Sequence, residues 1–278
     1  MHKGKLFNEA GRIDTSARWV AAGESDAYMI TVLIPAFNEE QALAPVIAGI
    51  SAKLGSRSIT IVIDDGSTDA TAAEARRCGA EVIRLAANQG KGAAMRLGRA
   101  RAAALAGDIV VAIDADGQHD PACLPDLVAP VAAGTHDMVI GSRYLADSSR
   151  GATPHNRYLV RNLTCRYLGK ALATNLTDPY SGLRAYNRRV LDEMRLIGPG
   201  YQNELELLYE AAIHGWRVCE IPIPRLYPPN SSKMGARGGK LIGRVRVLSG
   251  YAATMVRKGR ELRVVRDASK RNHVQDTS

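Results

Sequence analysis

Residues 108–120 read DIVVAIDADGQHD, a short aliphatic run that passes directly into acidic and polar residues. The β-branched first half predicts a buried strand, and because Asp is a poor strand residue, we expect that strand to end near Asp114. Asp114 and Asp116 leave the strand end together, and with Gln118 they offer the oxygen ligands that Mg²⁺ and Mn²⁺ prefer. A solvated turn leading into a helix explains the same residues, so this motif alone leaves both interpretations open.

The same arrangement recurs along the first half of the chain, where short apolar runs alternate with segments of helical spacing. The apolar runs are 29–36, 59–63, 81–85, 108–113 and 138–141, and the helical segments are 39–54, 70–78, 91–106 and 121–132. Alternating strands and helices predict an α/β fold, with a mostly parallel sheet covered by helices on both faces. Ligands of such sheets bind at the carboxyl ends of the strands, where the acidic residues of this chain fall.

Two further motifs lie at the same predicted edge. The segment DDGSTD (64–69) follows a strand, and the carboxylate of Asp65 is suited to accept hydrogen bonds from a base or a ribose hydroxyl. Thr68 and Asp69 are better suited to cap the next helix. The segment NQGKG (88–92) opens a helix, whose N-terminus favours phosphate. It lacks the spacing of a P-loop or a dinucleotide fingerprint, so close packing of the helix on the sheet explains its glycines equally well.

The regular alternation stops after residue 143. The spacing predicts a loop at 144–155, helices at 156–173 and 202–214, a strand at 217–222 and a basic, partly apolar helix from residue 236. Glu204 and Glu206 are predicted to face solvent in part, because the apolar face of their helix lies elsewhere. The chain is thus divided into a loosely ordered leader (1–28), an α/β domain (29–235), a basic amphipathic helical extension (236–263) and a polar tail (264–278).

Two absences indicate the cellular setting. No run of about 18 apolar residues is present, so the sequence predicts no transmembrane helix. The four cysteines are far apart and form no CxxC pair. This pattern indicates reduced thiols in a cytoplasmic protein rather than zinc ligands or disulfides.

Positive charge is concentrated in the second half of the chain. The net charge is +9; residues 231–263 hold nine Lys or Arg and one acid, and residues 143–170 hold six and one acid. Such patches meet nucleic acid, an anionic membrane or phosphorylated substrates, and the lack of an aromatic stacking platform argues against nucleic acid. Basic and apolar residues interleave in 236–263, which is typical of a helix lying on an anionic membrane. A surface helix that packs on the domain or pairs with a second subunit is the alternative.

The order of these motifs resembles that of the family 2 glycosyltransferases. The motifs that carry the resemblance are PAFNE (35–39), DDGSTD (64–69), NQGKG (88–92), DADGQHD (114–120), GSR (141–143), DPYSGLR (178–184), ELE (204–206) and IPIP (221–224). Within that family the chain is similar to the dolichyl- and polyprenyl-phosphate sugar synthases. The resemblance covers about residues 30–235, and it implies a GT-A-like, Rossmann-type sheet in which residues 29–235 form the catalytic domain.

The resemblance also implies roles for individual residues. The nucleoside would be held by Pro35, Phe37, Glu39, Ile63 and Asp65, with Asp114 and Ala115 beside the ribose and the diphosphate. The metal would be held by Asp116, Gln118 and the adjacent Asp114, and catalysis would rest on Asp116 and Arg143. Lys233 would close over the diphosphate, Arg157 would bind the acceptor phosphate, and Arg161, one helical turn later, would extend that basic patch. The family often has serine in place of Arg161, which leaves acceptor recognition open.

The implied reaction is an inverting, metal-assisted transfer of a hexosyl or N-acetylhexosaminyl group. The donor is a nucleoside diphosphate sugar, with GDP or UDP left open, and the acceptor is a polyprenyl or dolichyl phosphate. We expect a protein peripheral on the cytoplasmic face of a membrane, alone or as a homo-oligomer. A hydroxyl acceptor is the first alternative; it requires a general base, for which Asp178, Glu204 and Glu206 are the candidates. A nucleotide-binding protein without catalysis is the second.

Overall fold

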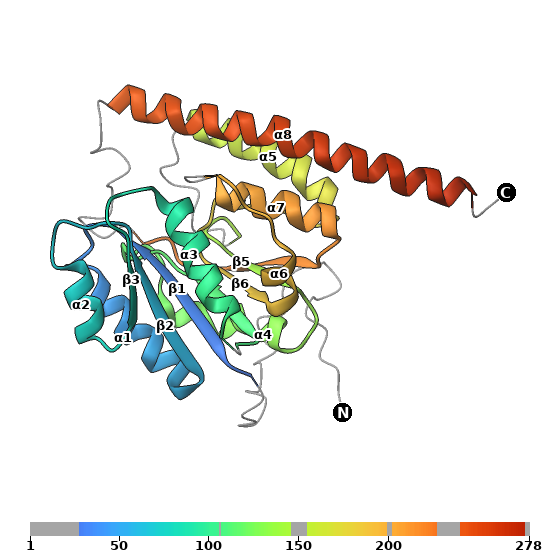
Figure 1. Ribbon diagram of the computed structural model, residues 1–278. Coiled ribbons are helices and arrows are strands. Elements are labelled where there is room, and N and C mark those ends of the chain that lie inside the picture. Colours follow the sequence, from blue (N-terminus) through green and yellow to red (C-terminus); the bar gives the residue numbers. More distant parts are fainter. Residues whose placement is uncertain (1–27, 106, 146–154, 199–201, 227–239, 276–278) are drawn as a thin grey trace.

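One seven-stranded sheet forms the centre of the protein, in the order β3-β2-β1-β4-β6-β5-β7 (Figure 1). The computed structural model describes residues 28–105, 107–145, 155–198, 202–226 and 240–275, except for the side chains of 155–160, 240–248, 266 and 268–275. The strands are β1 Ile30–Ala36, β2 Ser58–Asp64, β3 Glu81–Arg84, β4 Ile109–Ala112, β5 Met138–Ser142, β6 Arg184–Asn187 and β7 Val218–Pro222. Only β6 runs antiparallel to its neighbours, β4 and β5. The predicted mostly parallel sheet is confirmed.

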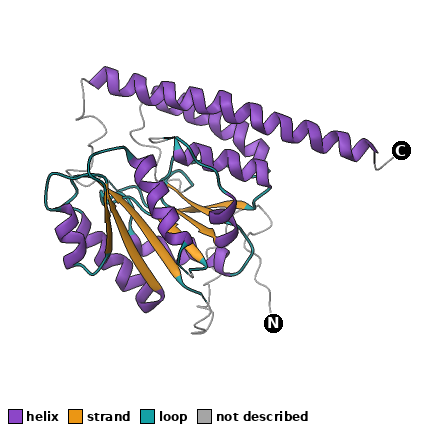
Figure 2. Cartoon of the chain, in the orientation of Figure 1, coloured by secondary structure: helices purple, strands orange, loops and turns teal. Residues whose placement is uncertain are grey.

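Helices cover both faces of the sheet (Figure 2). The first face carries α1 Leu43–Leu54, α2 Thr71–Arg77 and α4 Leu124–Ala132. The second face carries α3 Lys91–Ala103, α6 Arg188–Glu193 and α7 Asn203–His214. Outside α7 lie α5 His155–Leu172 and α8 Lys240–Gln275, and Figure 1 shows α8 crossing above α5 with its end projecting beyond the domain.

The alternation of side chains along the strands builds two separate cores. In β1, Val32 and Ile34 pack beneath α1, while Leu33 between them packs on the α3 side. A strand buried on both faces reads as a continuous apolar run, which is why the sequence of β1 shows no polar alternation. The strands of the sheet are therefore rigidly held, and the loops at their carboxyl ends have a fixed base.

Several features differ from the sequence-based expectations. Strand β6 was not predicted, because its four residues, RAYN, contain no apolar run. Glu204 and Glu206 are 9% and 0% exposed, so the prediction that they face solvent in part is wrong; α7 lies between the sheet on one side and α5 and α8 on the other. Helix α8 continues through residue 263, where a polar tail was expected to begin, and reaches Gln275.

Part of α8 is bound to the domain by charge. Lys258, which the sequence placed among headgroup-facing cations, is 4% exposed and lies 2.6 Å from Glu210 of α7. Arg257 forms an ion pair with Glu206. The packing alternative therefore holds for these two residues. Among the described residues, no helix is both long and apolar enough to cross a membrane.

Candidate active site

Two loops at the carboxyl edge of the sheet are joined into one platform. Asn38, which follows β1, has a positive φ of 53° and accepts a hydrogen bond at its side-chain oxygen from the backbone of Thr68, at 2.9 Å. In return, the backbone N–H of Asn38 donates to Ser67 Oγ at 2.9 Å. Pro35, Phe37 and Glu39, predicted to hold the nucleoside, lie half-buried in this platform. The structure therefore brings this part of the predicted nucleoside site together.

Asp65 positions a third loop. Its carboxylate, in a residue only 4% exposed, accepts hydrogen bonds from Gln89 N at 2.7 Å, from Gly90 N at 2.8 Å and from the side chain of Asn88 at 2.8 Å. Gly66 has a φ of 72°, and a Cβ there would lie 2.6 Å from the backbone of Ala87, so only glycine permits this approach. The carboxylate thus fixes the segment that starts α3.

Two residues of the predicted nucleoside set have side chains in the core. Ile63 is fully buried against α3, where Gly98 leaves room for it. Ala115 is 3% exposed and belongs to the core on the opposite face. Contacts from these two positions to a nucleoside would have to come from backbone atoms.

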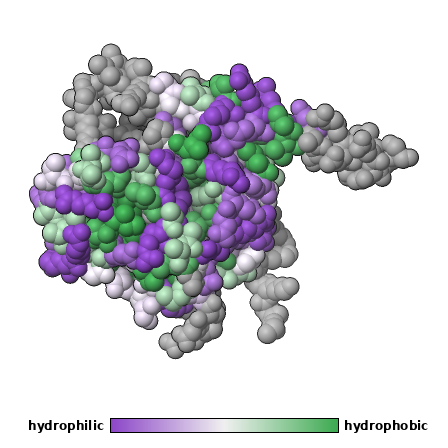
Figure 3. Space-filling view, in the orientation of Figure 1, coloured by the Kyte–Doolittle hydropathy of each residue, from purple (hydrophilic) through white to green (hydrophobic). Residues whose placement is uncertain are grey.

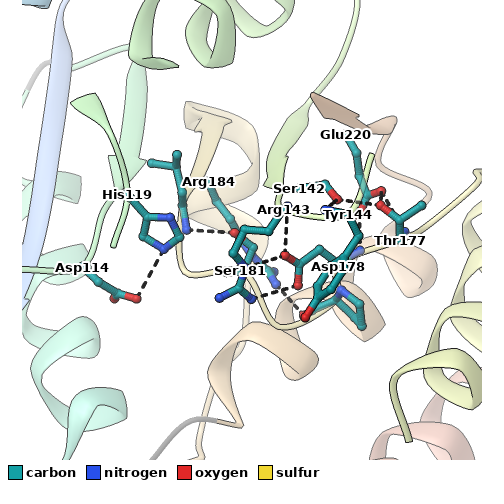
Figure 4. A network of polar contacts seen from close by, with 12 residues as sticks. Asp114, His119, Ser142, Arg143, Tyr144, Thr177, Asp178, Ser181, Arg184 and Glu220 are labelled. Atoms are coloured by element: carbon teal, nitrogen blue, oxygen red, sulfur yellow. Dashed lines mark hydrogen bonds and ion pairs between the residues drawn. The ribbon is translucent and has the colours of Figure 1, made fainter. Parts of the chain in front are cut away.

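Asp114 lies in a cluster of charges that comes from three elements. Lys91, at the start of α3, places its Nζ atom 2.6 Å from Asp114 Oδ1 and 2.7 Å from Glu204 Oε1 of α7. His119 Nε2 lies 3.6 Å from Asp114 Oδ2 (Figure 4). Burial, the largest influence, favours the neutral acid, yet Lys91 and His119 outweigh it and hold the pKa of Asp114 well below its usual range. A Cβ added at Gly182 would collide with this carboxylate.

Asp116 and Gln118 fit a divalent cation. Both are half-buried beyond the end of β4, and Asp116 Oδ1 accepts a hydrogen bond from Gln118 N at 3.0 Å. Burial, followed by the charge of Asp114, raises the pKa of Asp116 above its usual range, so a cation beside it would relieve an unfavourable negative charge. Asp114, predicted as a third ligand, is engaged by Lys91 and His119. The described residues contain no cluster of three or more His, Cys, Asp or Glu that could hold a metal alone.

Arg143 is held at the end of β5 by a buried carboxylate. Asp178, 1% exposed, accepts from Arg143 Nε at 2.7 Å and from Nη2 at 3.0 Å, and it also accepts from the backbone N–H of Arg143 at 3.2 Å. This two-pronged geometry fixes the plane of the guanidinium. The predicted catalytic arginine therefore has a defined orientation toward the site (Figure 4).

Three arginines gather around one aromatic ring. The guanidinium carbons of Arg161, Arg225 and Arg143 lie 3.9, 5.4 and 6.0 Å from the ring centre of Tyr144. Cation–π contacts favour such placement, and three cations so close together favour a bound anion. Arg157 lies on α5, but its side chain is outside the described part of the structure, as are Lys233 and most of the predicted 144–155 loop.

The sequence interpretation missed several members of the site. Lys91 stood in the quoted NQGKG motif, but no role was given to it; its place directly after a glycine turn at a helix start was the available signal. Arg225 was not assigned, and neither were Thr177 and Glu220, which support Asp178. Thr177 contacts Ser142 from 35 residues away, and Arg225 contacts Tyr144 from 81 residues away, so no local pattern in the sequence reveals these contacts.

Residues 31–195 match the family described as glycosyl transferase family 2. A polyprenol monophosphomannose synthase of Mycolicibacterium smegmatis is 32% identical over 201 residues, which cover 69% of this chain and 75% of the relative. An undecaprenyl-phosphate mannosyltransferase of Micrococcus luteus is 31% identical over 202 residues, which cover 70% of this chain and 82% of the relative.

Solved structures agree in fold. Glucosyl-3-phosphoglycerate synthase from Mycobacterium tuberculosis in complex with UDP gives a TM-score of 0.63 at 28% identity, covering 84% of this chain and 80% of that chain. Its complex with Mn²⁺, UDP-glucose and phosphoglyceric acid gives a TM-score of 0.60 at 28% identity, with the same coverage. The motifs, the sheet with its polar carboxyl edge and these similarities agree: the chain belongs to glycosyl transferase family 2 and is a glycosyltransferase with a GT-A-like fold.

Proposed function

We propose that this enzyme transfers a sugar from a nucleoside diphosphate sugar to a polyprenyl phosphate at a membrane surface, with inversion at the anomeric carbon. The observation that carries the proposal is the arginine cluster around Tyr144. Arg143, Arg161 and Arg225 lie within 6.0 Å of its ring centre, beside the end of β5. Such a cluster is suited to a phosphate group on the acceptor. The names of the two relatives quoted above point to the same acceptor class.

The donor is placed along the loops that follow β1, β2 and β4. The platform of Asn38 and Ser67 would take the nucleoside, and Asp116 would face the diphosphate. As the glycosidic bond breaks, negative charge grows on the leaving diphosphate. The guanidinium of Arg143, held rigidly by Asp178, would stabilise that charge without having to reorient.

The site residues fit a reaction that needs no general base. A phosphate acceptor is already ionised near neutral pH, so no proton has to be removed from it. The three carboxylates considered as bases each contact a cation, and a carboxylate so engaged would have to release it in order to accept a proton. The pairs are Asp178 with Arg143, Glu204 with Lys91, and Glu206 with Arg257.

A divalent cation would be held by Asp116 and Gln118 together with the donor phosphates. When bound, Mg²⁺ or Mn²⁺ would neutralise charge on the leaving diphosphate. The choice of hard oxygen ligands and the raised pKa of Asp116 both support such an ion.

An apolar groove next to the arginine cluster offers a place for the isoprenoid chain. The groove, about 500 Å³, lies between α5 and α8 above α7. It is lined by Leu163, Thr164, Tyr167, Leu168, Tyr209, Met255, Val256, Gly259, Arg260 and Arg263. Thr164 of its α5 wall lies three residues after Arg161 and so on the same side of that helix, which would leave the chain of a phosphate bound at the arginines near the mouth of the groove.

A small phosphorylated acceptor with a hydroxyl nucleophile is the second candidate. The structural neighbour binds phosphoglyceric acid, and the arginine cluster would suit such a molecule equally well. The groove is the feature that separates the two, because a small acceptor leaves it unused.

The test is incubation of the full chain with Mn²⁺ and labelled UDP- or GDP-linked hexoses and N-acetylhexosamines. Parallel arms contain polyprenyl phosphate in vesicles, phosphoglyceric acid or no acceptor. Label in the organic extract supports the proposal, and label in a water-soluble conjugate supports the second candidate. Equal release of free sugar in all arms contradicts both.

A substitution in the groove refines the test. A Cβ added at Gly259 meets only Tyr167 Oη, at 3.8 Å, so the helix leaves room for a side chain to start there, and Gly259→Phe should extend into the groove. The KM for a long-chain polyprenyl phosphate should rise about tenfold, as expected for the loss of roughly 1.4 kcal/mol of apolar contact, with no change for a short-chain analogue. Ala253→Phe, exposed on the same helix, is the control. Equal KM changes for long and short chains would exclude the groove as the chain site.

A further inference from the structure

We propose that Glu220 is a positioning residue for Arg143, acting from β7 through the segment Thr177–Asp178. Its carboxylate accepts three hydrogen bonds: from Thr177 N at 2.7 Å, from Thr177 Oγ1 at 2.6 Å and from Asp178 N at 2.8 Å. Asp178 in turn accepts from Nε and Nη2, along one edge of the Arg143 guanidinium (Figure 4). The inference rests on the proposed function only in that Arg143 there acts on the leaving group.

The same carboxylate sets the direction of a second chain of hydrogen bonds. Because an ionised carboxylate only accepts, the hydroxyl hydrogen of Thr177 must point at Glu220. Thr177 Oγ1 is then left to accept from the hydroxyl of Ser142, 2.6 Å away. Ser142 Oγ in turn accepts from the backbone N–H of Tyr144 at 3.2 Å. One group on β7 therefore fixes both the guanidinium of Arg143 and the backbone that carries the Tyr144 ring.

Protonation of Glu220 would disturb both chains. A carboxylic acid must donate its own hydrogen, and the nearest oxygen it already contacts is Thr177 Oγ1. The Thr177 hydroxyl would then donate to Ser142, whose hydrogen would lose its acceptor. At the same time the protonated oxygen, no longer charged, would be a weaker acceptor for the N–H of Thr177. The ionised form is therefore the one that matches the observed geometry.

Burial raises the pKa of Glu220 into the neutral range. Glu220 is 7% exposed, and burial is the main cause that raises its pKa to about 7, against the hydrogen bonds from Thr177 and Asp178. The charged or titratable groups that interact with it are Asp178, Cys165, Cys219 and Arg184. Half-buried Cys165 and buried Cys219 stay protonated, since burial raises both thiol pKa values to about 12.

Stability and activity should respond to pH in opposite directions. A carboxyl whose pKa is raised by folding stabilises the fold below its unfolded pKa, and that contribution is lost as pH rises through about 7. Activity should instead rise through the same range, because the ionised form orients Arg143. A purely structural role would make both fall together.

The test compares the wild type with Glu220→Gln and Thr177→Val. Wild-type kcat should rise with pH through about 7. Glu220→Gln should be flat with pH and lowered about tenfold to a hundredfold, with a smaller change in donor KM, because an amide cannot accept all three bonds. Thr177→Val keeps a titrating Glu220 and should keep the acid limb at reduced kcat. Wild-type kcat and pH profile in Glu220→Gln would overturn the proposal.

Asp137→Asn is the matched control. Asp137 is a second buried carboxylate between β5 and β7, but it lies at the other end of these strands, on Arg217. Its loss should lower stability and leave the pH profile of kcat unchanged. The same change of profile in Asp137→Asn would show an effect of stability alone and overturn the proposal.

A readout independent of turnover separates this inference from the proposed acceptor. Exchange protection of the Thr177 and Asp178 amides, measured by NMR, should weaken in the wild type as pH falls below about 7 and be weak at all pH values in Glu220→Gln. Protection that is insensitive to both pH and substitution would overturn the inference, even if lipid transfer is observed. Protection that follows the expectation would keep it, even if no lipid product forms.

Discussion

The Nζ atom of Lys91 lies 2.6 Å from Oδ1 of Asp114, although the two residues belong to different motifs. The lysine stands at the first residue of α3, whose start is fixed by the carboxylate of Asp65. The first aspartate of the DADGQHD motif is therefore neutralised by the protein itself, which leaves Asp116 as the more available carboxylate for a metal ion.

Replacement of Lys91 should lower the stability of the protein, because it leaves two carboxylates without their cation. In Lys91→Met, the half-buried Asp114 and the nearly buried Glu204 would be left as neighbouring unpaired carboxylates, at a cost of up to about 3 kcal/mol of unfolding free energy. Urea unfolding should show the loss, and Glu204→Gln added to Lys91→Met should restore part of it. Full additivity of the two substitutions would contradict the ion-pair assignment.

Asp116→Asn should strongly lower metal-dependent activity while raising the stability of the metal-free protein. The raised pKa of Asp116 means that its ionised form costs folding free energy at neutral pH, and the amide removes that cost. Turnover should fall about 10²–10³-fold. Mn²⁺ should raise the melting temperature of the wild type but not of Asp116→Asn.

Asp120→Asn is the control, because Asp120 caps the following turn from the same loop and should leave the effect of Mn²⁺ intact. Undiminished turnover of the wild type in EDTA would rule out the metal site.

Asp137 should make the fold acid-sensitive. The hydrogen bonds from Arg217, the leading cause, lower its pKa to about 2. A depressed pKa contributes stability above the unfolded value, near 4, and that contribution is lost as pH falls through about 2. Asp137→Asn should therefore cost about 1–3 kcal/mol at pH 7, by weakening or removing the part-buried hydrogen bonds from Arg217, and the difference from wild type should shrink below about pH 4.

Urea unfolding across this pH range measures the effect. Asp192→Asn, which breaks a surface pair with Arg188 in which both side chains are exposed, should cost less than about 0.5 kcal/mol. A constant Asp137→Asn penalty from pH 7 down to about 2 would show that ionisation of Asp137 is not the cause.

Helix α8 should bind anionic membranes through its outer face. Val256 and Val264 are 56% and 66% exposed there, close in sequence to exposed Arg260 and Arg263; Val256 and both arginines also border the groove between α5 and α8. Figure 3 shows hydrophobic and hydrophilic residues side by side on the described part of this helix. At about 1 kcal/mol per cation, Arg260→Glu with Arg263→Glu should lower vesicle affinity at least tenfold. Flotation of the full chain with anionic vesicles at low and high salt measures this.

The matched control reverses two exposed charges on the opposite face of the sheet, Lys53→Glu with Arg77→Glu. Equal loss of flotation in both double variants would mean that net charge, and not α8, determines binding. A full chain that stays unbound at low salt would exclude the membrane role.

The parts of this protein that are local in sequence were predictable. Each apolar run before an acidic motif became a strand with that motif at its carboxyl end, as at Asp65 and Asp114, because strand propensity and burial agree there. Strand β6 could not be recognised, since Arg184–Asn187 owes its place to pairing with β4 and β5 rather than to its own composition.

The site's supporting residues needed the fold. Glu206 was expected to face solvent in part because a helical pattern shows one apolar face, whereas α7 is covered on both sides and its carboxylates are buried in pairs. The contact of Glu220 with Thr177 joins residues 43 positions apart, and the periodicity of the sequence predicts only contacts within a helix or strand.

The strand order also has a consequence for biosynthesis. Strands β3, β2, β1 and β4 come from residues 30–112 and form one side of the sheet. The second hydrogen-bonding partner of β4 is β6, residues 184–187, which is synthesised later. At about 5–20 residues per second, the ribosome needs roughly 4–14 s to supply that partner. Through this interval the nascent chain carries an open, fully apolar strand edge, Ile109–Ala112, which is a template for pairing with other chains. Chaperone protection during synthesis should matter most in that interval.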